Sequence, residues 1–113
     1  MNKIVKLFIT SISAITLALV SFTSSFAKVD GEYIVLGSAI SLTGKYSSNR
    51  VHTQNGYNMA VERINKLGGV EVQGKKYKFE IIYYDDESNP KRAAQLAERL
   101  IKQDGVHYML GPY

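Results

Sequence analysis

The chain has 113 residues, 14 basic and 10 acidic side chains, a net charge of +4 at neutral pH and no cysteine. The charges of both signs are interspersed, which argues against the clustered basic surface of a nucleic-acid-binding protein. Without cysteine, no disulfide can stabilise the fold.

The first 27 residues have the pattern of a secretory signal peptide. Lys3 and Lys6 precede a mostly apolar run over residues 7–20, and small and polar residues follow up to Ala27. The alternative, a membrane-spanning helix, needs about 20 apolar residues, and this run is shorter and interrupted by hydroxyl side chains. We therefore expect cleavage after Ala27 and a periplasmic location, with free secretion as the alternative. Residues 28–113 would then form one small domain with a net charge of +2.

A strand, a polar loop and a helix come first in this domain. Residues 33–40 are apolar on both faces, as in a strand buried between two helical layers. Residues 41–56 predict a loop, and residues 57–67 predict an amphipathic helix that ends at Gly68-Gly69. The residues expected on the buried face of this helix are Tyr57, Ala60, Val61, Ile64 and Leu67.

The second half repeats the alternation. Residues 70–85 predict a short arm, a turn at Gln73-Gly74 and a long strand. Asn89 and Pro90 are typical of the N-cap and first position of a helix, which Gly105 would end. The residues expected on its buried face are Ala93, Leu96, Ala97, Leu100 and Ile101. Residues 106–110 predict a third strand.

The order β-α-β-α-β predicts an α/β fold with a parallel sheet. With right-handed crossovers, the three strands pair in the order 2-1-3 and the two helices cover opposite faces. Ligands bind such sheets at the carboxyl end of the strands, where the strand order reverses. The loop after residues 33–40 and the loop after the third strand would therefore form the site.

A nucleotide-binding loop is the first chemical motif to consider. Gly37, Gly44 and Lys45 resemble a phosphate-binding loop, but six residues separate the glycines where that motif has four. Tyr46 also stands where a hydroxyl side chain would reach the metal. We reject this reading.

Acidic and basic clusters give no catalytic constellation either. Asp85-Asp86-Glu87 could hold a metal or accept a phosphate, but adjacent residues of a strand point to opposite sides, so a solvated strand end is favoured. His52 and His107 are far apart, which favours surface or packing roles over zinc. We expect no enzymatic activity, no metal and no cofactor.

Three residues of the loop after the first strand are candidates for ligand contact. Tyr46 would supply an aromatic wall, Asn49 an amide and Arg50 a cation. Ordinary loop solvation, with Tyr46 packed on the domain, explains the same residues equally well. The sequence leaves both readings open.

A series of short motifs nevertheless resembles one known family, the leucine/isoleucine/valine-type periplasmic binding proteins, which are type I solute receptors of ABC importers. The motifs are Ser41-Leu-Thr-Gly44, Tyr46, Asn55-Gly-Tyr-Asn-Met-Ala-Val-Glu-Arg-Ile-Asn65, Gly68-Gly-Val70, Tyr84-Asp-Asp-Glu-Ser-Asn-Pro90, residues 94–100 and Gly111-Pro-Tyr113. They span residues 32–113 in the family's order and spacing. The specificity lies in the series, since no single motif is distinctive.

The resemblance implies a receptor with two lobes that closes on an amino acid-like ligand and delivers it to a membrane permease. It implies that residues 28–113 are part of the N-terminal lobe and that Tyr46, Asn49, Arg50 and Tyr113 contact the ligand. Many relatives have Tyr-Gly where this chain has Asn49-Arg50, so the pocket differs in wall and charge. The sequence stops at Tyr113, so we expect an incomplete lobe. A ligand-sensing domain of an exported receptor is the alternative function.

Overall fold

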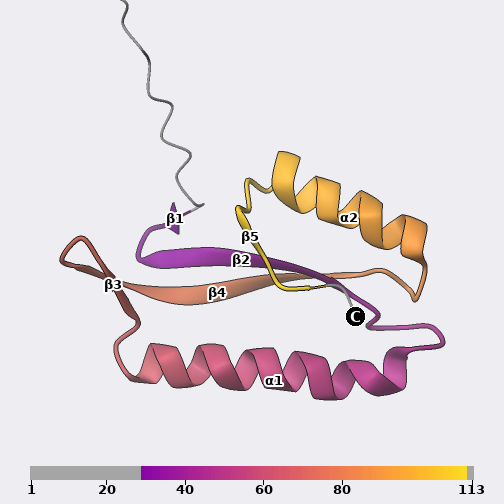
Figure 1. The fold of residues 1–113 in the computed structure, drawn as a ribbon, viewed down its shortest axis with the longest axis horizontal. Coiled ribbons are helices and arrows are strands. Elements are labelled where there is room, and N and C mark those ends of the chain that lie inside the picture. The colour runs from indigo at the N-terminus through magenta and orange to yellow at the C-terminus, as the bar shows by residue number, and fades with distance from the viewer. Residues whose placement is uncertain (1–28, 112–113) are drawn as a thin grey trace, which may run out of the picture.

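The computed structural model describes residues 29–111, which form a mixed sheet with one helix on each side (Figure 1). In chain order the elements are β1 (Val29–Asp30), β2 (Tyr33–Ile40), α1 (Ser47–Lys66), β3 (Val70–Val72), β4 (Lys75–Asp85), α2 (Pro90–Lys102) and β5 (Tyr108–Met109). Neither helix in this part of the chain is long and apolar enough to cross a membrane. The expected signal peptide lies outside the described residues.

The sheet is built around β2. This strand pairs in parallel with β4 along its whole length, from Tyr33 opposite Lys78 to Ile40 opposite Asp85. β2 also pairs antiparallel with β1 and in parallel with β5, while β3 forms an antiparallel hairpin with β4. The order is β1-β2-β4-β3, with β5 paired to β2 off this path. It differs from the expected all-parallel order 2-1-3 because β1 and β3 add short antiparallel strands.

Helix α1 is longer than the sequence indicated. It begins at Ser47, so most of the expected loop over residues 41–56 is helical. No side chain caps its start; instead, the Tyr46 amide donates to Ser88 Oγ and the Arg50 guanidinium donates to the Leu42 carbonyl. Contacts with distant segments therefore fix the start of α1, and the local sequence does not reveal them.

Helix α1 lies against β4 mainly through half-buried and polar side chains. It contains no fully buried residue, and Leu67, expected on the buried face, is 76% exposed just after the helix ends. Ala60 is also exposed, whereas Tyr57, Val61 and Ile64 are half-buried as expected. The apolar part of the packed face is therefore narrower than predicted. The polar side chain of Asn65 also faces the strand, where it bonds the backbone of Phe79.

The turns follow local sequence chemistry. Gly68-Gly69 ends α1 as expected, with the Gly69 amide donating to the Ile64 carbonyl. Gly69 has φ of +84°, and a Cβ there would lie 2.0 Å from the Tyr77 carbonyl oxygen. Only glycine fits this conformation and this approach of two backbones. The expected turn at Gln73-Gly74 joins β3 to β4.

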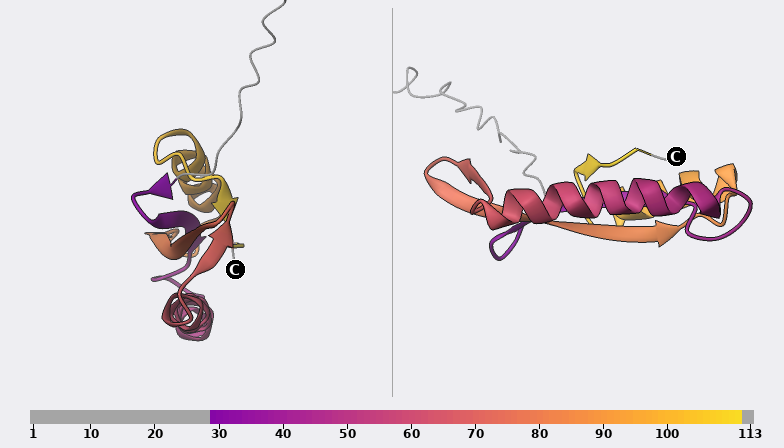
Figure 2. Two further views of the ribbon diagram at one scale, coloured as in Figure 1. Left: turned by 90° about the vertical axis from the view of Figure 1, so that its left-hand side faces the viewer. Right: turned by 90° about the horizontal axis from the view of Figure 1, so that it is seen from below.

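Helix α2 covers the opposite face of the sheet from α1, as the end-on view shows (Figure 2). The expected cap is confirmed, since Asn89 Oδ1 accepts from the amides of Lys91 and Arg92 and Pro90 follows at the first position. Ile101 was expected to be buried but is 54% exposed. The main core lies under α2 and consists of Val35, Ala39, Leu100 and Val106, with Ile82, Tyr84 and Leu96 packed against it.

The third expected strand is shorter than residues 106–110. β5 covers Tyr108–Met109 alone, because the Val106 amide donates to the Leu100 carbonyl and not to the sheet. Val106 is nonetheless buried in the core. β5 returns the chain to β2, where the Leu110 amide donates to the Gly37 carbonyl.

Candidate functional site

Two loops meet at the carboxyl end of the sheet. One follows β2 (residues 41–46) and the other follows β4 (residues 86–89). They lie side by side because Ile40 and Asp85 pair in register, and the Asp86 amide donates to the Ile40 carbonyl at 3.1 Å. Ser41 Oγ donates to Asp86 Oδ1 at 2.7 Å, a buried hydrogen bond between the loops. We call the bonded side chains of Ser41, Thr43, Asp85, Asp86 and Ser88 the loop network.

Asp85 holds the loop after β2 from its exposed side. Its carboxylate accepts from the amide and the hydroxyl of Thr43, at 3.0 and 2.7 Å, and from the Glu87 amide at 2.9 Å. Burial acts to raise the pKa of Asp85, but the hydrogen bonds donated by Glu87 and Thr43 outweigh it and hold this pKa below its usual value. The carboxylate is therefore charged at neutral pH.

Ser88 joins both loops to the start of α1. Its hydroxyl donates to the Thr43 carbonyl at 2.9 Å and accepts from the Tyr46 amide at 3.0 Å. The loops approach so closely that a Cβ at Gly44 would lie 2.5 Å from the Glu87 carbonyl oxygen, and Gly44 has φ of +87°. A residue without a side chain is required there. The loop network thus fixes the position of the Tyr46 backbone, from which the side chain projects.

The first turn of α2 is held by a basic residue. Arg92 Nε donates to the Asp85 carbonyl at 3.1 Å, and its guanidinium lies 3.6 Å from Glu87. A cation in this turn opposes the helix dipole, and the sequence alone gives no reason for it. The structure supplies one: Arg92 ties α2 to the strand end.

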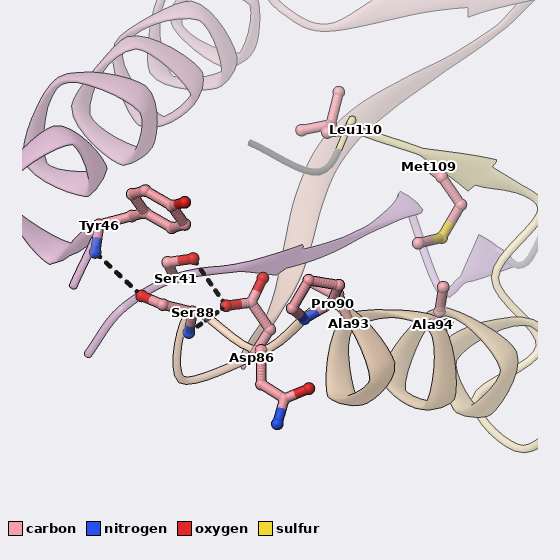
Figure 3. Close-up of a pocket in the computed structure, with 12 residues that line it drawn as sticks. Ser41, Tyr46, Asp86, Ser88, Pro90, Ala93, Ala94, Met109 and Leu110 are labelled. Carbon is pink, nitrogen blue, oxygen red and sulfur yellow. Dashed lines mark hydrogen bonds between the residues drawn. The ribbon is translucent and has the colours of Figure 1, made fainter. Parts of the chain in front are cut away.

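A pocket of about 470 Å³ opens between the loop network, α2 and β5 (Figure 3). Apolar side chains make most of its wall, with Ser41, Asp86, Ser88 and Asn89 at one end. The apolar and aromatic lining residues are Ala39, Tyr46, Pro90, Ala93, Ala94, Ala97, Met109 and Leu110. This is the composition of a small-molecule site: an apolar cavity with a few convergent polar groups.

The four residues expected to contact a ligand are placed differently. Tyr46 lines the pocket and is 45% exposed, with the Lys45 ammonium 4.6 Å from the centre of its ring. Asn49 is exposed in the first turn of α1 and does not line the pocket. Arg50 is also outside the lining and binds the Leu42 carbonyl. Tyr113 lies outside the described residues.

Asp86 is the pocket residue that sequence reasoning missed. A solvated strand end was favoured for the acidic run, but Asp86 is 3% exposed. Two adjacent acids give no local sign of which one turns inward. The register of β2 against β4, which puts Ser41 beside Asp86, was the signal that could have identified it.

Metal ligation has no support in residues 29–111, where no group of three or more His, Asp or Glu side chains is placed to hold an ion. His107 Nδ1 lies 2.9 Å from the Gly105 carbonyl oxygen, and His52 is exposed on α1. The site as described consists of hydroxyls, one buried carboxylate, an aromatic ring and apolar walls. It can bind a small molecule by shape and hydrogen bonding.

A helix-flanked sheet with its pocket at the carboxyl end of parallel strands defines an α/β ligand-binding lobe. The chain belongs to the periplasmic binding protein family, whose profile matches residues 34–113.

Relatives with curated descriptions agree with this. The Leu/Ile/Val-binding protein BraC3 of Rhizobium johnstonii is 32% identical over 88 residues, which cover 78% of this chain and 23% of that protein. An amino acid binding protein of Pseudomonas aeruginosa is 33% identical over 108 residues, which cover 96% of this chain and 27% of that protein. The chain spans about a quarter of the length of these relatives.

A solved structure gives the same fold. LivJ of Streptococcus pneumoniae, a branched-chain amino acid transporter substrate binding protein in complex with isoleucine, has a TM-score of 0.60 and 28% identity. The match covers 69% of this chain and 21% of that one. These relatives are described as binding proteins and not as enzymes.

Proposed function

We propose that this chain is part of the N-terminal lobe of an exported solute-binding receptor of an ABC importer. The receptor binds an amino acid or a similar small carboxylate between two lobes that close like a hinge, and it delivers this ligand to a membrane permease. Residues 1–27 are the signal peptide, removed after Ala27, and residues 28–113 act in the periplasm. The proposal includes no catalytic step and no cofactor.

The pocket at the carboxyl end of β2 is the observation that carries the proposal. Its volume of about 470 Å³ suits a ligand of amino acid size, and it lies at the end of the sheet where α/β proteins bind ligands. Family membership and the amino acid-binding relatives support the same ligand class.

Within this proposal, Tyr46, Asn49, Arg50 and Tyr113 contact the ligand. Support is strongest for Tyr46, whose side chain lines the pocket. Arg50 uses one N–H group to donate to the Leu42 carbonyl. A guanidinium has five N–H donors, so the others remain for a ligand carboxylate. Asn49 is exposed at the start of α1, so its amide is accessible to a ligand.

A ligand-sensing domain of an exported receptor is the second candidate, because the same lobe serves either purpose. Permease genes beside this gene would favour transport. A kinase or chemoreceptor region in the same reading frame would favour sensing.

Binding of the twenty common amino acids, one at a time, tests the proposal. Isothermal titration calorimetry of the mature receptor with both lobes, of which residues 28–113 are part, should detect at least one ligand. Tyr46→Ala should weaken that ligand about tenfold, through loss of aromatic contact area. Tyr33→Ala is the matched control, since Tyr33 is similarly exposed, at 39%, at the other end of β2. No binding, or equal losses in both variants, would refute the proposal.

A further inference from the structure

Asp86 is a buried carboxyl side chain, 3% exposed, with a one-sided set of partners. Both hydrogen bonds to its carboxylate end on Oδ1, from Ser41 Oγ at 2.7 Å and from the Ser88 amide at 2.8 Å. In Figure 3 the other carboxylate oxygen points into the space between Ser41 and Pro90, on the pocket side. Asp86 is itself one of the pocket-lining residues. A carboxylate oxygen is therefore directed at the cavity.

No cation of residues 29–111 neutralises this carboxylate. No Lys, Arg or His nitrogen in the described chain lies within 4.0 Å of it, although four ion pairs are formed elsewhere. Arg92, the arginine nearest to it in sequence, binds the Asp85 carbonyl and Glu87 instead. Buried charges in proteins are almost always paired, because desolvating an unpaired ion is costly.

The surroundings of Asp86 determine which cation could pair with it. No group of three or more His, Asp or Glu side chains in residues 29–111 is placed to hold a metal ion at this carboxylate. An ammonium group needs acceptors only, and it could carry an apolar substituent along the wall formed by Ala93, Ala97 and Met109. A small primary ammonium with an apolar side chain matches both halves of the pocket.

We propose that Asp86 binds the ammonium group of the ligand through Oδ2, while Ser41 and Ser88 hold Oδ1. This inference rests on the proposed function and adds to it the group of the ligand that this lobe recognises. The loop network then has two tasks. It joins the loops after β2 and β4, and it presents one carboxylate oxygen to the pocket.

The variant Asp86→Asn tests the carboxylate's role in the pocket while it leaves the connection between the two loops in place. An asparagine oxygen can still accept from Ser41 and Ser88, so the loops stay joined, but the negative charge is lost. Asp104→Asn is the matched control, because Asp104 is a half-buried carboxylate at the end of α2 that accepts from the Tyr84 hydroxyl and does not line the pocket. The contribution of the ligand's amino group must also be separated from that of the rest of the ligand. Each amino acid found to bind is compared with its analogue that lacks the amino group, for example isoleucine with 3-methylpentanoate.

Calorimetric titration of the two-lobed receptor with these ligands gives the test. Asp86→Asn should weaken the amino acid about 10- to 100-fold, the loss typical of a charged hydrogen bond. It should leave the affinity for the analogue without the amino group unchanged, and Asp104→Asn should leave both affinities unchanged. A mainly structural role for Asp86 would instead weaken both ligands equally.

The outcomes also distinguish this inference from the proposed function. If an amino acid binds and Asp86→Asn binds it equally well, or loses both ligands alike, the ammonium assignment is wrong and the binding function stands. If none of the twenty amino acids binds the wild-type receptor, both fail.

Discussion

Asn65 offers the sharpest test of how α1 is attached to the sheet. Its side-chain amide donates to the Phe79 carbonyl and accepts from the Phe79 amide, both at 2.8 Å. Asn65 thus occupies a position on β4 that a neighbouring strand would otherwise fill. Since α1 has no fully buried residue, these two bonds carry an unusual share of its attachment.

The expected loss of stability follows from the two hydrogen bonds between Asn65 and Phe79. Two hydrogen bonds at about 0.5–1.5 kcal/mol each give about 1–3 kcal/mol, and replacing asparagine by alanine in a helix returns up to about 0.7 kcal/mol. We therefore expect Asn65→Ala to lower the free energy of unfolding by about 0.3–3 kcal/mol. Urea denaturation measures this value. Hydrogen exchange at the Phe79 amide should also accelerate, because that amide loses its acceptor.

Asn58→Ala is the control. Asn58 is on the same helix and accepts one exposed bond from the Tyr83 hydroxyl at 2.8 Å, so the change in helix propensity cancels between the variants. The reasoning is refuted if Asn65→Ala costs no more than Asn58→Ala, or if the Phe79 amide keeps its protection. Self-association of Asn65→Ala alone, seen by sedimentation, would show that Asn65 also shields the edge of β4.

Three further predictions concern single positions. Gly56 lies inside α1, where an added Cβ meets nothing within 4 Å, so Gly56→Ala should raise the free energy of unfolding by about 0.5–1 kcal/mol in urea denaturation. Ser38 Oγ is fully buried and has no hydrogen-bond partner in the described chain, so Ser38→Ala should be neutral or stabilising by up to about 3 kcal/mol, and a loss of stability would contradict this. The lowered pKa of Asp85 means that its carboxylate stabilises the fold above the unfolded pKa of about 3.9, and this stability is lost as pH falls through the folded value. Asp85→Asn should therefore reduce stability at neutral pH. Below about pH 4, the urea concentration at the unfolding midpoint should depend less on pH in this variant than in the wild type.

Features fixed by neighbouring residues could be predicted from the sequence. The cap at Asn89 and Pro90 and the helix stop at Gly68-Gly69 depend on local backbone chemistry, and the structure has both. The pair of Glu62 and Lys66, four residues apart on α1, is formed at 2.7 Å. These cases need no knowledge of the rest of the fold.

Features fixed by contacts between separate segments could not be predicted from the sequence. The start of α1 depends on Ser88 and Leu42, which lie in two loops, and a polar stretch containing Gly56 has no helical periodicity to reveal it. The inward turn of Asp86 depends on the register of β2 against β4. The edge strand β1 is too short to leave a clear pattern, and the short arm expected before the long strand joins the sheet as β3, so the expected strand order was incomplete.

Asp85 and Asp86, at the same strand end, are held by separate sets of hydrogen-bond donors. They share no hydrogen-bond donor: Thr43 and Glu87 bind the first, and Ser41 and Ser88 bind the second. Their substitutions should therefore add, with Asp85→Asn changing the pH dependence of stability and Asp86→Asn changing ligand affinity. The Ser88 hydroxyl is the link that could break this independence, since it bonds the Thr43 carbonyl. A double-mutant cycle in urea denaturation decides: a coupling energy beyond about 0.5 kcal/mol would contradict additivity and mean that the two loops unfold as one unit.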